Sequence, residues 1–241
     1  YAGGWEPAAS ATDIEYITIS STGNAIAFGQ CTGGTQSSNG ASSETRAIVH
    51  AGGAVPGGSN TNAIEYVTIA HLGNAIDFGD QTAVNRASGH CSSPTRGVFG
   101  GGYVTNTTVN TIQYITIATL GNAAEFGDLT VIRTQLGTGG SATRGLFVSG
   151  ATTPNANTQV IDYITIATLG NAAYFGDLTE PTRGTCAVTS TLRTVRTGGY
   201  VEQNTMDYVE IPTTGNAIDF GDLADARRSI SGCSNGHGGL G

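Results

Sequence analysis

Large apolar residues alternate with smaller or more polar ones in five short stretches of the chain. In Tyr163-Ile-Thr-Ile-Ala, for example, isoleucine alternates with tyrosine, threonine and alanine. This two-residue period and the abundance of β-branched residues are typical of half-buried strands. No segment sustains the 3.6-residue period of an amphipathic helix. The pattern therefore predicts an all-β chain.

Each stretch belongs to a motif of about 48 residues that occurs five times. Every copy starts with a tyrosine, contains Gly-Asn-Ala, and reaches a Phe-Gly pair whose phenylalanine stands 12 residues after the tyrosine. The tyrosines are Tyr16, Tyr66, Tyr114, Tyr163 and Tyr208, and the phenylalanines are Phe28, Phe78, Phe126, Phe175 and Phe220. We expect the phenylalanines to be structural core residues of the repeat.

Two further positions recur in four of the five copies. An aspartate follows Phe-Gly, and an arginine stands 18 residues after the phenylalanine: Asp80, Asp128, Asp177 and Asp222, with Arg46, Arg96, Arg144 and Arg193. A ligand site usually occurs once in a chain, whereas residues that stabilise a repeated fold occur in every repeat. We therefore expect that the aspartate and the arginine of neighbouring repeats form an ion pair or a hydrogen bond, or that the aspartate caps backbone amides. A calcium-binding ring of carboxylates and an anion-binding arginine remain alternatives.

The invariant part of the motif predicts a β-hairpin. Gly170-Asn171 supplies two residues that accept positive φ, as a tight hairpin turn requires, and this would place Ile166 opposite Phe175. Two more strands complete the unit, one of them ending in Gly-Gly. Four short strands in a repeat of this length are typical of a β-propeller blade.

The two ends of the chain match adjacent parts of one repeat. Residues Tyr1 to Trp5 match Phe99 to Tyr103, and Cys233 to Leu240 match Cys91 to Val98. We therefore predict a single domain, residues 1–241, that is a five-bladed propeller of four-stranded antiparallel blades. Pairing of the N- and C-terminal segments within one blade would close the ring, whereas an open solenoid needs distinct capping repeats.

Composition and charge exclude several classes of function. The net charge is −8 and the chain has no lysine, so its surface would repel nucleic acid. No apolar run reaches the roughly 18 to 20 residues of a membrane span, and no signal peptide is visible. Since the sequence starts at Tyr1, we expect a processed product, an excised domain or part of a longer protein.

Neither the cysteines nor the histidines are spaced like metal ligands, and no catalytic motif is present. We accordingly predict no enzyme activity, no metal and no cofactor. Buried free thiols are the favoured interpretation of the cysteines and a disulfide is the alternative; they are Cys31, Cys91, Cys186 and Cys233.

The repeat resembles a kelch repeat, in which a strand ending in Gly-Gly precedes a variable loop, a tyrosine and a later aromatic residue. Phe-Gly-Asp-Leu stands here where kelch repeats have tryptophan. The string from Asp162 to Asn171, with Phe-Gly-Asp-Leu and Thr-Arg-Gly after it, is similar to repeats in proteins of marine and other aquatic tailed phages. Those are regarded as tail-fibre or other virion proteins. The resemblance implies a virion-surface or extracellular location, virion proteins as partners, and oligomers formed through the larger assembly.

The loop that follows Gly-Gly is the best candidate for a ligand site, because it varies most among the copies. Aromatic rings with Asn and Thr suit sugar binding, and the candidates are Trp5, Tyr103, Asn106, Asn155, Tyr200 and Asn204. A polar connector whose aromatic residue packs on the neighbouring blade is the plainer interpretation.

We therefore expect a non-enzymatic module that attaches to a host-surface carbohydrate or to another virion protein. A capsid-decorating or filament-forming propeller without a ligand is one alternative. A glycan-active enzyme is another, and it would require two carboxylates roughly 5 to 10 Å apart in one pocket.

Overall fold

The computed structural model describes residues 2, 5–6, 9–33, 39–50, 61–153 and 155–232. Within these ranges the secondary structure is entirely β, and every strand pair is antiparallel. No helix in the described part of the chain could cross a membrane. The predicted all-β, antiparallel class is therefore confirmed.

Four sheets in the described residues share one topology, in which the strands of the motif pair in chain order. The first contains β5 (Asn39–Ser42), β6 (Arg46–His50), β7 (Ala63–Thr68) and β8 (Ile76–Asp80). The second contains β10 (Gly89–Ser92), β11 (Arg96–Gly100), β14 (Thr111–Thr116) and β15 (Ala124–Asp128). The third contains β16 (Gly137–Gly140), β17 (Arg144–Val148), β19 (Ala156–Thr165) and β20 (Ala173–Thr182). The fourth contains β21 (Cys186–Thr189), β22 (Arg193–Thr197), β23 (Gln203–Glu210) and β24 (Ile218–Arg227).

The first copy of the motif is represented by its last two strands, β3 (Asp13–Tyr16) and β4 (Ile26–Gln30). Ala2 forms an antiparallel bridge with Ile14, as Gly100 does with Ile112 in the second sheet. Ala2 thus has the pairing that the motif gives to its second strand. Residues 233–241, the other half of the expected closure, lie outside the described residues. The closed five-bladed ring and the single domain stay predictions.

Six short strands lie outside these four-stranded units. They are β1 (Trp5–Glu6), β2 (Ala9–Ser10), β9 (Asn85–Arg86), β12 (Tyr103–Val104), β13 (Thr107–Thr108) and β18 (Ala151–Thr152). β1 pairs with β2, β12 pairs with both β9 and β13, and β18 pairs with the start of β19.

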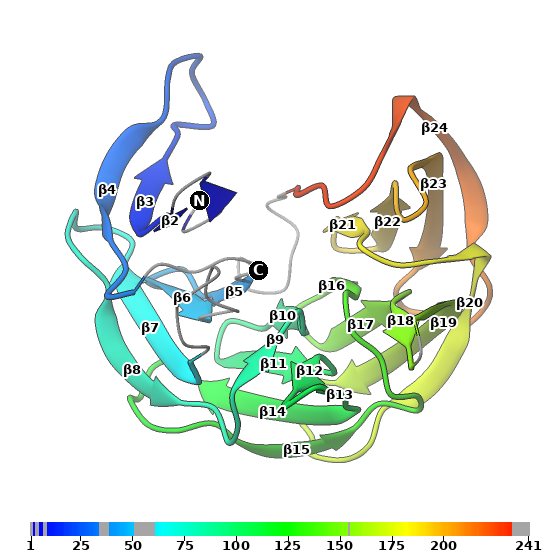
Figure 1. Ribbon diagram of the computed structural model, residues 1–241, viewed down its shortest axis with the longest axis horizontal. Coiled ribbons are helices and arrows are strands. Elements are labelled where there is room, and N and C mark those ends of the chain that lie inside the picture. The colour runs from blue at the N-terminus through cyan, green and yellow to red at the C-terminus, as the bar shows by residue number, and fades with distance from the viewer. Residues whose placement is uncertain are drawn as a thin grey trace.

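The sheets stand side by side along an arc, as Figure 1 shows. The first strands of the four sheets, β5, β10, β16 and β21, lie on the inner side, and each contacts its neighbour. The last strands, β8, β15, β20 and β24, lie on the outer side. In the described residues the arc is open between the β3–β4 hairpin and β24 (Figure 1).

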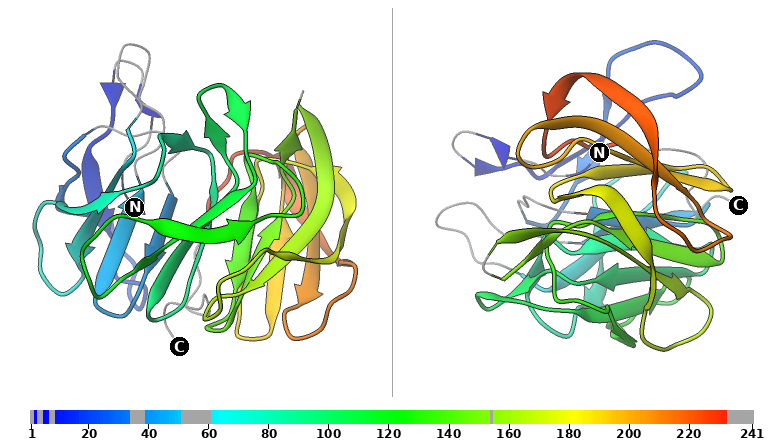
Figure 2. Two further views of the ribbon diagram at one scale, coloured as in Figure 1. Left: turned by 90° about the horizontal axis from the view of Figure 1, so that it is seen from below. Right: turned by 90° about the vertical axis from the view of Figure 1, so that its right-hand side faces the viewer.

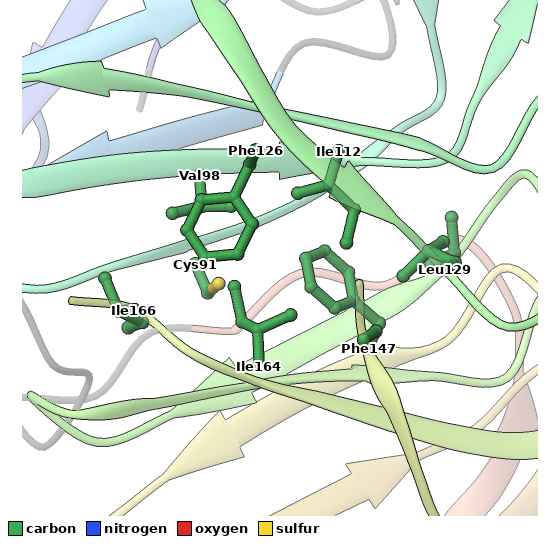
Figure 3. Packing of buried hydrophobic residues seen from close by; sticks show 10 residues of the cluster. Cys91, Val98, Ile112, Phe126, Leu129, Phe147, Ile164 and Ile166 are labelled. Atoms are coloured by element: carbon green, nitrogen blue, oxygen red, sulfur yellow. The ribbon is translucent and has the colours of Figure 1, made fainter. Parts of the chain in front are cut away.

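The hydrophobic core is divided among the spaces between adjacent sheets, since alternate side chains of a strand point to opposite faces. Between the second and third sheets, Cys91, Phe126 and Ile112 of one sheet meet Phe147 and Ile164 of the next (Figure 3). Equivalent clusters surround Phe78 and Phe175, each 2 % exposed. The predicted core role of these two phenylalanines and of Phe126 is confirmed. The prediction is wrong for Phe220, which is 52 % exposed because no following sheet covers β24 in the described residues, and Phe28 is only partly buried.

The predicted tight turn at Gly170-Asn171 is wrong. β19 ends at Thr165 and β20 begins at Ala173, so the connector spans residues 166–172. The last residue pair of this hairpin is Tyr163 with Ala173, and β19 ends before Ile166. Ile166 therefore does not face Phe175. Ile166 instead packs into the core of the preceding sheet (Figure 3).

The Gly-Asn-Ala segment joins neighbouring sheets, which explains why it recurs. Gly170 donates its backbone N–H to the carbonyl of Phe126 at 2.9 Å, and Ala172 donates to that of Asp128 at 2.8 Å. Asp128 in turn donates its N–H to the Asn171 side-chain oxygen at 3.0 Å. We call this set of hydrogen bonds between two neighbouring sheets a seam. Four seams occur in the described residues, centred on Asn74, Asn122, Asn171 and Asn216. Glycine is required after the phenylalanine, because a Cβ on Gly127 would lie 2.3 Å from the Gly170 oxygen.

Candidate functional site

Two of the predicted ligand residues lie together in the β12–β13 hairpin. Tyr103 is in β12, and Asn106 is at the two-residue tip. Thr105 and Asn106 have φ angles of 42° and 67°, the left-handed values of a type I′ hairpin turn. Asn tolerates this conformation better than most residues. The hairpin is therefore locally specified by its sequence.

Buried Asn85 anchors this hairpin to the second sheet. Its side-chain amide donates to the Gly101 carbonyl at 2.8 Å, and its oxygen accepts the Tyr103 N–H at 2.9 Å. Gly102 has a φ of 111°, and a Cβ there would lie 2.1 Å from the Asn85 oxygen. The Gly-Gly pair before Tyr103 thus permits the close approach that fixes the loop.

A pocket of about 250 Å³ opens beside the hairpin. It is lined by Val84, Arg86, Tyr103, Thr105 and Asn106. The Arg86 guanidinium carbon lies 5.0 Å from the centroid of the Tyr103 ring, and no carboxylate of the described residues pairs with Arg86. The pocket therefore combines an aromatic ring, an amide, a hydroxyl and an available positive charge.

Sequence reasoning missed Arg86, although a signal was present. Three copies of the motif carry an arginine eight residues after the phenylalanine: Arg86, Arg183 and Arg228. This position is less regular than the tyrosine, Gly-Asn-Ala and Phe-Gly positions, which occur in all five copies.

Tyr200 and Asn155 are also brought together, through Arg183. The Arg183 guanidinium lies 4.2 Å from the Tyr200 ring centroid and donates to the Asn155 carbonyl at 2.9 Å. Arg228 lies 5.0 Å from the same ring and pairs with Glu202 at 3.1 Å. Tyr200 therefore packs against residues of the third sheet and its exit, in agreement with the plainer interpretation of an aromatic residue on the neighbouring blade.

The remaining two candidates contribute little to a site. Asn204 is exposed on β23, and the side chain of Trp5 is outside the described part of the structure. The β1–β2 and β12–β13 hairpins project from one face of the molecule (Figure 2). The Tyr103 pocket belongs to the second of these hairpins.

The recurring arginines are scaffold, but the expected contact with aspartate is wrong. Arg46, Arg96 and Arg144 stack over the tyrosine of their own sheet, with 4.5 to 4.8 Å between guanidinium carbon and ring centroid. Each also donates at 2.7 to 2.8 Å to a carbonyl in the connector of the next sheet: Ile117, Ile166 and Ile211. Arg193 stacks over Tyr208 in the same way, at 4.6 Å, but it pairs with Glu210 at 2.5 Å instead of a carbonyl of another sheet.

The recurring aspartates act mainly through their backbone. Asp80, Asp128 and Asp177 exchange backbone hydrogen bonds with the Gly-Asn-Ala segment of the next sheet. Neither a carboxylate ring nor any other group of three or more metal-ligating side chains occurs among the described residues.

A second inter-sheet contact involves residues that we did not predict. In four copies the residue before the motif tyrosine accepts a hydrogen bond from a threonine of the preceding sheet, as Gln113 does from Thr82 and Asp162 from Thr130. The signal was an acid or amide before every motif tyrosine: Glu15, Glu65, Gln113, Asp162 and Asp207. In two sheets this acid also binds a buried arginine.

One of these arginines, Arg133, is fully buried. Its guanidinium contacts the Asp162 carboxylate at 2.7 Å and donates to the carbonyls of Phe147 and Ser149. Burial lowers the pKa of Arg133 to about 10, an effect that Asp162 opposes. The group therefore stays charged at neutral pH, and its role is structural.

Two other sets of reactive side chains are buried. Cys31 and Cys91 are buried thiols outside any disulfide, and burial raises their pKa to about 11 and about 12. Cys186 is half-buried and its thiol contacts the Ala187 carbonyl. Free thiols were the favoured interpretation; Cys233 lies outside the described residues. His50 and His90 pack 5.0 Å apart, ring centroid to ring centroid, against Phe99. None of these groups is placed as a nucleophile or base beside the Tyr103 pocket.

Comparison with known proteins adds no family assignment: no family model matches this chain, and no curated protein sequence matches it.

Proposed function

We propose that this chain is a non-enzymatic, five-bladed propeller module of a virion that attaches to an acidic carbohydrate of a host surface. The phage-like repeat supports the virion setting. The Tyr103 pocket carries the proposal for the ligand, because it lies on the face where the repeats differ most. A host carbohydrate is the first candidate partner, and another virion protein is the second.

The chemistry of the pocket favours a sugar that bears a carboxylate. The Tyr103 ring offers an apolar surface, while Asn106 and Thr105 offer hydrogen-bonding groups for hydroxyls. The planar guanidinium of Arg86 matches the geometry of a carboxylate. A charge fixed beside an aromatic ring thus gives the pocket its selectivity.

Binding of the purified chain to an array of acidic and neutral oligosaccharides tests this function. We expect acidic sugars to bind, Tyr103→Ala to weaken binding about tenfold or more, and Arg86→Gln to remove the preference for acidic over neutral sugars. Tyr174→Ala is the matched control, because Tyr174 is 53 % exposed on β20, away from the pocket. Absence of binding to every sugar and to intact host cells would contradict the proposal.

A structural role without a ligand is the second candidate, and one observation favours it. Both ends of the arc expose apolar residues, among them Ile19 at 87 % and Phe220 at 52 %. Chains could join through these ends into a filament or a capsid decoration. Negative-stain images of the source particles would separate a tail appendage from a capsid decoration or a free filament.

A further inference from the structure

The four seams between described neighbouring sheets follow one rule, and the two ends of the arc each hold half of a fifth seam. In the formed seams, the isoleucine three residues after the motif tyrosine is buried against the preceding sheet wherever that sheet is complete: Ile117, Ile166 and Ile211 are at most 2 % exposed. The equivalent Ile19 is 87 % exposed.

The surface that would cover Ile19 is also present and uncovered. Phe78, Phe126 and Phe175 are at most 4 % exposed, whereas the equivalent Phe220 on β24 is 52 % exposed. A Cβ on Gly176 would lie 2.1 Å from the Gly215 oxygen, but one on Gly221 would meet only Met206, at 3.9 Å. β24 therefore has the outer edge of a seam without the connector that fills it elsewhere.

We infer that residues 17–25, the connector between β3 and β4, dock on β24 of the same chain and close the arc into the ring. The inference rests on the propeller proposed above. Gly23 donates its N–H to the Phe220 carbonyl and Ala25 donates to that of Asp222. The Asn24 side chain accepts the Asp222 N–H, and Ile19 packs on Phe220.

Arginine chemistry supports the same pairing. Arg46, Arg96 and Arg144 each donate to the carbonyl of the isoleucine that follows in the next sheet. Arg193 is their equivalent, and its counterpart acceptor is the carbonyl of Ile19. In the open arc Arg193 instead binds Glu210, an exposed pair that contributes little to stability. Exchange of this partner for Ile19 therefore costs little.

The fifth seam lacks a hydrogen bond that three of the other four have, and this favours its opening. Thr32, Thr130 and Thr179 donate their hydroxyls to the acid of the next sheet, whereas Thr82 donates its backbone N–H to Gln113. Ala224 occupies the equivalent position before Glu15 and has no hydroxyl to donate. The same chain is the expected occupant, because a tethered connector has a high effective concentration beside β24.

Three alanine variants test the inference. Ile166→Ala removes a side chain buried in a formed seam, and Leu169→Ala removes one that is 51 % exposed in the same connector. We expect Ile19→Ala to lower the urea midpoint as much as Ile166→Ala does, in a chain that sediments as a monomer. A midpoint shift no larger than that of Leu169→Ala would overturn the inference.

Mass measurements identify the occupant. If Ile19→Ala destabilised only assemblies whose mass grows with protein concentration, the connector would dock on a second copy and the same-chain inference would fail. Binding of acidic sugars at the Tyr103 pocket is an independent readout, since this pocket is formed by the loops of one sheet. Loss of closure with sugar binding retained would therefore reject this inference and leave the proposed function standing.

Discussion

Replacement of Asp162 by alanine is expected to destabilise the protein by about 3 to 5 kcal/mol, as breaking a buried ion pair does. The variant leaves the Arg133 guanidinium at 0 % exposure without its carboxylate partner, 2.7 Å away in the native protein. It also leaves the Thr130 hydroxyl, which donates to Asp162 at 2.6 Å, without an acceptor. Urea unfolding at pH 7, followed by far-UV circular dichroism, measures the loss.

The matched control is Glu210→Gln, which removes the acid of an ion pair that is 50 % and 41 % exposed. Exposed pairs contribute little to stability, so we expect a urea midpoint close to that of the wild type. A loss below about 1 kcal/mol for Asp162→Ala would show that water or a neighbouring group compensates Arg133.

A double variant separates the effect of the unpaired charge on stability from the effect of the lost side-chain volume. Because much of the cost is an unpaired buried charge, replacement of both partners in Arg133→Met with Asp162→Leu is expected to recover most of the lost stability. If the double variant were as unstable as Asp162→Ala alone, the hydrogen bonds of the pair to backbone carbonyls would be the essential feature.

The strands and their period could be predicted from the sequence, because both depend on local patterns. Alternation around Tyr163 and the fixed distance to Phe175 locate the last two strands of the repeat, and Ala2 pairs with Ile14 as the matched ends imply. Local propensity is consistent with the fold in these segments, as is usual for sequences that specify one structure.

Contacts between sheets could not be predicted in the same way. Gly170-Asn171 has the composition of a tight turn, yet its backbone pairs with Phe126 and Asp128 of another repeat. Hydrogen bonds to a distant edge outweighed the local turn preference. The partners of Arg46, Arg96 and Arg144 are likewise backbone carbonyls, which every residue has, so the sequence does not identify them. The contact of Arg86 with Tyr103 also depends on a pairing of separate strands, β9 with β12.

Acidification is expected to weaken the contact between the first and second sheets. His50 and His90 are 1 % and 7 % exposed, and both are in contact with Phe99; Ser88 forms a 2.9 Å hydrogen bond with His90. No carboxylate of the described residues bonds to either ring. Burial lowers the pKa of His50 from 6.5 to about 4, and burial together with the charge of His50 lowers that of His90 well below 6.5.

The sign of the effect follows from proton linkage. Below pH 6.5 the unfolded chain binds protons that the folded protein does not, so stability falls as the pH falls, until the folded-state pKa is reached. The shift at His50 corresponds to a loss of about 3 kcal/mol between pH 7 and pH 4, at 1.36 kcal/mol for each pKa unit. Urea midpoints at several pH values in this range measure the wild-type slope.

Carboxylates elsewhere in the chain also titrate in this range, so the difference between variants isolates the histidine effect. His50→Phe keeps an aromatic ring against Phe99 and removes the titrating group, and we expect a clearly shallower loss of stability from pH 6.5 to 4. His71→Gln is the control, since His71 is exposed in the connector after β7, and its pH profile should match that of the wild type. Equal slopes for the wild type and His50→Phe would mean that the His50 environment admits water, because only a hydrated ring could bind its proton as readily in the folded protein as in the unfolded chain.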